Sequence, residues 1–173
     1  MKRTIAGRFQ VDDLQPILTA DARDAMLDLV LRWASLDGAV SQLFAAAFGK
    51  IDEEHADEVT NEKMSVKLRK IELALRPMLP GLAATISKLK KQAERYGQLR
   101  DTIAHCHCAG MLKSKPDYII FLRYRRHKTG GLIVDAIPIE KVNSATQFAE
   151  HLRTTVQKLD SVIRGKYPTD HVA

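Results

Sequence analysis

The sequence is poor in cysteine and has no long apolar run. Its two cysteines, Cys106 and Cys108, stand two positions apart. Such a pair cannot form a disulfide framework, which excludes the disulfide-rich secreted domains and favours a reduced, cytoplasmic protein. No apolar run approaches the roughly 20 residues of a membrane-spanning helix, and the charged N-terminus lacks the apolar core of a signal peptide. We therefore expect a cytoplasmic protein with no membrane partner.

Aromatic residues are also few, at 6%, yet the hydrophobic fraction of 45% is ordinary for a globular protein. A chain of 173 residues is long enough to bury a core of its own. We therefore expect one domain over residues 1–173, with peripheral segments at 1–20 and 166–173.

The positive charge is local. Residues 1–110 carry 16 basic and 15 acidic side chains, and residues 131–173 carry 5 of each. Residues 111–130 carry 6 basic side chains and 1 acidic one, a net charge of +5. A local basic patch is typical of a polyanion binder, although lysine and arginine also protect exposed sheet edges. The candidate RNA-binding residues are Lys113, Lys115, Arg123, Arg125, Arg126 and Lys128.

Apolar residues recur at helical spacing in four segments. The first helix is expected over 21–48, with Asp21 as its N-cap and Trp33 in the core, and the second over 61–78. The third has the most regular spacing and is expected from about Gly81 to a C-terminal glycine at Gly110. The fourth is expected to have Asn143 or Ser144 as its N-cap and to end near Ile163.

Between the third and fourth helices the apolar period changes to two. Residues 117–125 and 132–139 are rich in β-branched and aromatic side chains and flank a segment with two glycines, which predicts a β-hairpin. Pro138 places the second strand at an edge. The predicted fold is mainly α: an up-down helical bundle of four principal helices with a β-hairpin insertion at 117–139 between the third and fourth.

Chemistry-bearing residues gather at the end of the third helix, in Arg100-Asp101-Thr102-Ile103-Ala104-His105-Cys106-His107-Cys108. A metal site is one hypothesis, but residues two apart on a helix point about 200° away from each other, so the cysteines and histidines cannot converge on one tetrahedral ion. A nucleophilic cysteine is a second hypothesis, although Cys106 falls on the core stripe. An ordinary helix end is a third, because a histidine there interacts well with the helix dipole.

The fourth hypothesis uses Arg100 and a histidine. A guanidinium binds a phosphate through two parallel hydrogen bonds and stabilises the charge that develops on phosphorus. A histidine moves protons near neutral pH. Together they suffice to cleave RNA by internal transesterification with no metal and no cofactor, leaving a cyclic phosphate and a 5′-hydroxyl.

The segment from Arg100 to His105 resembles the Arg-(polar)-x-x-x-His motif of HEPN domains, which are helical proteins with this motif at the end of a long helix. Asp101 occupies the polar position, where Asn is commoner. His105 leaves four intervening residues and His107 leaves six, and both fit the family's range. The resemblance implies a ribonuclease in which Arg100 binds phosphate, His105 or His107 transfers protons and Asp101 orients the pair. It also implies a toxin–antitoxin or defence role, with RNA as substrate and an antitoxin or regulatory protein as partner.

Helix geometry adds a condition to this resemblance. On an ideal helix Arg100 and His105 lie about 140° apart, whereas Arg100 and His107 lie about 20° apart and two turns along. One chain therefore does not obviously present Arg100 and His105 to one phosphate. HEPN-like proteins pair as homodimers with facing motifs, so we expect a homodimer. The alternative function is a catalytically inactive HEPN-like module that binds RNA or a protein partner.

Overall fold

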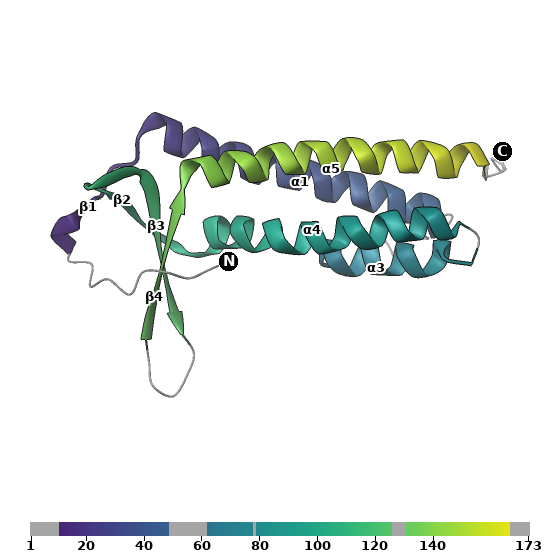
Figure 1. Cartoon of the computed structure of the whole chain (residues 1–173), viewed down its shortest axis with the longest axis horizontal. Coiled ribbons are helices and arrows are strands. Elements are labelled where there is room, and N and C mark those ends of the chain that lie inside the picture. Colours follow the sequence, from purple (N-terminus) through teal and green to yellow (C-terminus); the bar gives the residue numbers. More distant parts are fainter. Residues whose placement is uncertain (1–10, 49–61, 78, 126–130, 167–173) are drawn as a thin grey trace. The chain divides into compact units, whose positions relative to one another are not determined.

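The computed structural model describes residues 11–48, 62–77, 79–125 and 131–166. Within these ranges the chain is mainly helical and carries one small antiparallel sheet, which confirms the mainly α class (Figure 1). The elements, in chain order, are η1 (Val11–Asp13), β1 (Leu14–Gln15), α1 (Ala20–Phe48), α3 (Met64–Leu75), α4 (Pro80–His105), β2 (His107–Leu112), β3 (Lys115–Arg125), β4 (Gly131–Pro138) and α5 (Ile139–Lys166).

The chain divides into two compact units. The sheet unit comprises Met1–Leu31 and Gln98–Gln147, and the bundle unit comprises Arg32–Gly97 and Phe148–Ala173. The boundary falls inside α1, α4 and α5, so each of these helices contributes one end to each unit. The single domain over 1–173 stays a prediction.

Side-chain contacts join the four helices of the bundle unit in a ring. The pairs that make the ring, in the order α1–α3, α3–α4, α4–α5 and α5–α1, are Asp37 with Lys67, Glu72 with Lys90, Tyr96 with Phe148, and Arg32 with Glu150. Each helix thus touches two others, which is the arrangement of a four-helix bundle. The predicted bundle is confirmed at this level, while its up-down order stays a prediction.

The bundle core buries the apolar stripes of these helices together with two charged side chains of α3, Lys67 and Glu72. Trp33 is buried, as its spacing predicts, and its ring lies 3.3 Å from a Cβ placed on Gly97. Lys67 is also fully buried, and its Nζ donates to Asp37 Oδ1 (3.2 Å) and Ser41 Oγ (2.9 Å). A buried ammonium needs such partners, because desolvation of an unpaired charge costs several kcal/mol.

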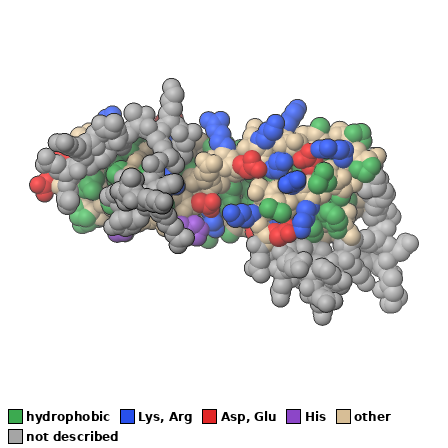
Figure 2. Space-filling model, turned by 90° about the horizontal axis from the view of Figure 1, so that it is seen from below, with side chains coloured by type: hydrophobic (Ala, Val, Ile, Leu, Met, Phe, Trp, Pro, Cys, Tyr) green, Lys and Arg blue, Asp and Glu red, His purple; other side chains and the backbone are tan. Residues whose placement is uncertain are grey.

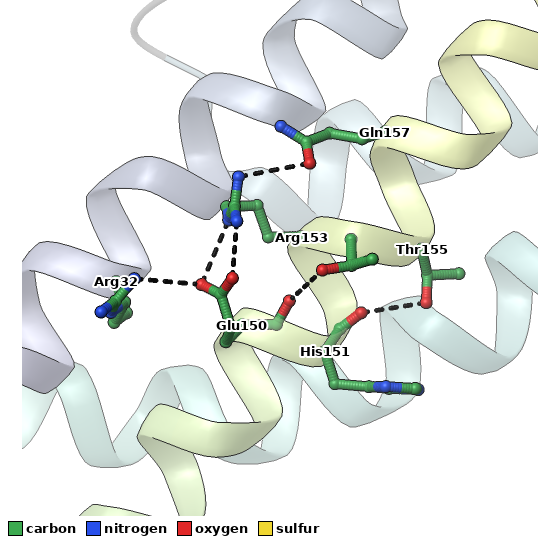
Figure 3. A network of polar contacts seen from close by, with 7 residues as sticks. Arg32, Glu150, His151, Arg153, Thr155 and Gln157 are labelled. Atoms are coloured by element: carbon green, nitrogen blue, oxygen red, sulfur yellow. Dashed lines mark hydrogen bonds and ion pairs between the residues drawn. The ribbon is translucent and has the colours of Figure 1, made fainter.

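A polar network links α1 and α5 on the bundle unit's surface (Figure 3). Arg153 donates to both carboxylate oxygens of Glu150, and its Nη1 donates to Gln157 Oε1 (3.2 Å). Arg32 Nη1 approaches Glu150 Oε2 from α1 at 3.4 Å. The hydrogen bonds from Arg153 lower the pKa of Glu150 below its ordinary value, and Arg32 lowers it further.

The four strands of the sheet unit form one antiparallel sheet in the order β1-β2-β3-β4. The prediction of a two-stranded hairpin insertion is therefore wrong. The predicted strands are present as β3 and β4, but β3 also pairs with β2, and β1 adds a strand from the predicted N-terminal periphery. Pro138 is the last residue of the edge strand β4, as an edge position predicts for proline.

One face of the sheet packs against helix. The Thr19 N–H, at the start of α1, donates to Sδ of Met111 (3.4 Å), so the Met111 side of the sheet faces α1. Register and strand alternation place Ile119, Phe121 and Ile137 on that side, and all three are buried. We call this the helix-facing side of the sheet.

Helix α4 ends at His105, earlier than predicted, and residues 107–110 are strand. The predicted C-terminal glycine, Gly110, instead lies within β2 with φ at 115°. A Cβ at Gly110 would lie 2.1 Å from the Gln15 carbonyl oxygen of β1. Gly110 is thus explained by a close approach of two strands and a left-handed backbone rather than by helix termination.

Both predicted caps are also wrong. Thr19 caps α1, because its Oγ1 accepts from the Ala22 N–H (3.3 Å), while Asp21 lies in the first turn. Helix α5 begins at Ile139, directly after β4, and Ser144 lies inside it, donating from Oγ to the Glu140 carbonyl (2.9 Å). The expected end of the second helix, Met78, and the end of the chain after residue 166 lie outside the described residues.

Replacement of Gly110 by alanine is expected to destabilise the sheet unit by about 1–3 kcal/mol, because the new Cβ meets the Gln15 carbonyl and the backbone conformation is strained for an L-residue. Gly38→Ala is the matched control. Nothing lies within 4 Å of a Cβ at this helical position, so alanine should stabilise by about 0.5–1 kcal/mol. Denaturant unfolding measures both, and equal effects would contradict the role assigned to Gly110.

The buried pair of Lys67 and Asp37 is expected to respond asymmetrically to substitution. Asp37→Ala leaves the buried ammonium with fewer partners and should destabilise by about 1–3 kcal/mol. Lys67→Met fills a similar volume without a charge and should be neutral or stabilising. Thermal unfolding of the two variants checks this order, and a larger loss in Lys67→Met would refute it.

Stability of the bundle unit is expected to fall in acid, in part through Glu150. Because the folded-state pKa of Glu150 is lowered, its contribution is present above its ordinary pKa and is lost as the pH falls through the folded value. Glu150→Gln should therefore flatten the decline of the melting temperature between about pH 6 and pH 3. Glu94→Gln, at an exposed position of α4, is the control and should leave the decline unchanged.

Candidate functional site

The candidate site begins with Arg100 and Asp101 in the penultimate turn of α4. Leu99, their buried neighbour, anchors this turn in the core of the sheet unit. Arg100 Nη1 lies 3.1 Å from Asp101 Oδ1, and the side chain of Arg100 is 31% exposed while that of Asp101 is 64% exposed. The Nε of Arg100 is buried and has no hydrogen-bond partner among the described residues. Asp101 therefore holds one edge of a guanidinium that still reaches solvent.

The two candidate histidines lie on different elements. His105 is the last residue of α4, and His107 is the first residue of β2, where it pairs with Leu122. Both are exposed. The expected angle of 20° between Arg100 and His107 is wrong, because the helix ends before His107 is reached. The angle of about 140° between Arg100 and His105 applies, since both lie within α4.

The cysteines lie between and beside these histidines. Cys106 follows the end of α4, and its N–H donates to the Thr102 carbonyl (3.0 Å). Cys108 pairs with Phe121 in the sheet, and both cysteines are half-buried with free thiols. Within the described residues, no three His, Cys, Asp or Glu side chains lie where they could hold a metal ion.

The candidate RNA-binding residues differ in what they contact. Lys113 Nζ donates to the Asp12 carbonyl (2.7 Å), and Lys115 Nζ lies 5.5 Å from the centre of the Tyr118 ring. Arg123 Nε lies 3.6 Å from Asp135 Oδ2. The side chain of Arg125, and Arg126 and Lys128 entirely, lie outside the described residues.

Asp135 is a candidate site residue that the sequence alone did not single out. Its side chain is 4% exposed and lies on the helix-facing side of the sheet, opposite Phe121. The sequence signal is an aspartate inside the apolar run Leu132-Ile133-Val134-Asp135-Ala136-Ile137. A carboxylate at a buried strand position needs a partner, so this pattern indicates a paired charge. That partner, Arg123, lies on the neighbouring strand and becomes evident only from the register.

Charged side chains of both signs lie on the face of the described helices that Figure 2 shows. Lys and Arg side chains alternate there with Asp and Glu over the described helices. This mixing agrees with the near balance of charge outside residues 111–130.

No protein-family model, no curated protein and no solved structure matches this chain. None of the described helices has the length and apolar character needed to cross a membrane. The function is therefore argued from the site itself.

Proposed function

We propose that this protein is a metal-independent endoribonuclease of the HEPN type. One observation carries the proposal: Arg100, with Asp101 on one edge, is followed within seven residues by two exposed histidines, and all four lie in one compact unit. An arginine and a histidine at solvent are the minimum set for phosphodiester cleavage by a neighbouring hydroxyl. The basic segment of residues 111–130 supplies further charge in the same unit.

In the proposed reaction, a histidine removes the proton from a ribose 2′-hydroxyl. The 2′-oxygen attacks the adjacent phosphorus, the bond from phosphorus to the 5′-oxygen breaks, and that oxygen takes up a proton. The products are a 2′,3′-cyclic phosphate and a 5′-hydroxyl, so no water, metal or oxidant is consumed. Arg100 binds the non-bridging oxygens and stabilises the negative charge that grows on them.

Two copies of the chain complete the proposed site. Arg100 and His105 diverge by about 140° around α4, which keeps them from converging on one phosphate from an ideal helix. His107 departs from the helix on β2, so the helix geometry does not bring it over Arg100 either. In a homodimer, the arginine of one protomer and a histidine of its partner would contact one phosphate. A toxin or defence role, with an antitoxin or regulatory partner, belongs to the same proposal.

The test is cleavage of single-stranded RNA in the presence of a chelator. Arg100→Ala is expected to lower the rate about 100-fold or more, since it removes the main stabiliser of the transition-state charge. His105→Ala should lower the rate by about 100- to 10,000-fold if His105 moves the proton, and His107→Ala by the same range if His107 does. Product analysis should find cyclic phosphates, and a 2′-deoxy linkage should resist cleavage.

His151→Ala is the matched control, because His151 is an exposed histidine of α5 in the bundle unit. It should cleave like the wild type. If the wild type cleaves RNA no faster than Arg100→Ala and His105→Ala, the enzyme proposal is refuted. RNA binding that survives in all variants would then favour the inactive RNA-binding module.

A further inference from the structure

The pair of Arg123 and Asp135 combines a buried carboxylate with a guanidinium that reaches solvent. The Asp135 side chain is 4% exposed, whereas that of Arg123 is 38% exposed. Arg123 Nε is buried, lies 3.6 Å from Asp135 Oδ2 and has no hydrogen-bond partner among the described residues. The carboxylate thus lies on the Nε edge of a guanidinium side chain that is in part exposed to solvent.

The register places this pair next to the candidate site. Leu122 pairs with His107, the first residue of β2, and Arg123 is one residue further along β3. Neighbouring strands lie about 4.8 Å apart, so the Arg123 backbone lies about one strand spacing from the junction between α4 and β2. Arg123 pairs with Ile133 on its other side, where β3 and β4 continue beyond the end of β2 as a two-stranded ribbon (Figure 1).

Strand alternation gives the direction of both side chains. Asp135 is opposite Phe121 and shares its side of the sheet, and Arg123 is two residues from Phe121 on the same side. This is the helix-facing side of the sheet. His107 pairs with Leu122 and so lies on the opposite side, whereas His105 is the last residue of α4, two residues before β2 begins. Two of the other predicted RNA-binding side chains, Lys113 and Lys115, are already engaged by a carbonyl and an aromatic ring.

We propose that Arg123, oriented by Asp135, binds a second phosphate of the RNA strand, next to the phosphate held at Arg100. This inference rests on the proposed function. A partly exposed arginine suits a phosphate, because a guanidinium forms paired hydrogen bonds to the phosphate oxygens. Asp135 is a positioning residue. Its negative charge lies beside the buried Nε of Arg123 and restricts the orientation of the guanidinium.

The test uses short RNA–DNA oligonucleotides with one ribonucleotide, and therefore one cleavable linkage. Each neighbouring phosphate is replaced in turn by an uncharged methylphosphonate. In the wild type, neutralisation at one neighbouring position should lower kcat/KM about 10- to 100-fold, the value of one charged hydrogen-bonded contact. In Arg123→Gln the same neutralisation should change kcat/KM less than about threefold, because the contact is already absent.

Asp135→Asn should raise KM severalfold for the fully charged oligonucleotide. It should leave KM nearly unchanged for the oligonucleotide that carries the methylphosphonate at the position to which the wild type is sensitive. A merely structural role would raise KM for both oligonucleotides alike. The matched controls are Arg164→Gln and Asp160→Asn on α5, whose ion pair joins the same atoms, Nε and Oδ2, at 2.9 Å in the bundle unit. Both should retain the wild-type sensitivity to neutralisation.

Binding of uncleavable 2′-O-methyl versions of the same oligonucleotides separates the two proposals. If the wild type cleaves but Arg123→Gln keeps its sensitivity to every neutralised position, the second phosphate site is refuted and the ribonuclease stands. If the wild type does not cleave, the ribonuclease fails. The second site then holds only if neutralisation at one position still weakens binding to the wild type about 10-fold and not to Arg123→Gln.

Discussion

The antiparallel pairing of β2 with β3 is the constraint on which the candidate site depends. Helix α4 ends at His105, and the residues from His107 onward pair with β3 in the sheet. Burial of Met111 and Leu112 and the close approach of Gly110 to Gln15 hold β2 in this place. Because the helix stops there, Arg100, Asp101 and His105 share one helix end while His107 belongs to a strand. The position at which β2 begins therefore determines how the candidate site residues are arranged at this junction.

Three of the arginine–carboxylate pairs among the described residues differ in burial, and burial decides what each can do. Arg153 and Glu150 lie at the surface of the bundle unit and contribute to stability, with the pKa of Glu150 lowered by the hydrogen bonds it accepts. Arg100 and Asp101 are adjacent on the helix, so their ion pair needs no tertiary contact. Arg123 and Asp135 come from two strands, and the carboxylate is almost fully buried. A buried carboxylate restricts its arginine most strongly, because water does not compete for it.

Helical periodicity predicted much of the fold, although the predicted boundaries moved. The apolar residues from Leu82 to Ile103 recur at the period of an α-helix, and all of them lie within α4. The prediction that the third helix ends at Gly110 was wrong. Glycine is favoured both after a helix end and where two strands approach closely, and the sequence does not distinguish the two. Likewise Cys106 continues the helical spacing, but the pairing of β2 with β3 outweighs one more helical turn. Local pattern cannot weigh such a competition, since strand pairing joins residues far apart in the chain.

The sequence by itself determined the helical class, the strands β3 and β4 and the cluster of Arg100, Asp101, His105 and His107, because these follow from short-range periodicity and from residues close together in the chain. Only the tertiary structure decided that the strands form a four-stranded sheet, that α4 ends at His105 and that Asp135 is the partner of Arg123. Those features depend on register between distant segments. Register is set by which side chains are buried together, and a single chain segment does not carry that information.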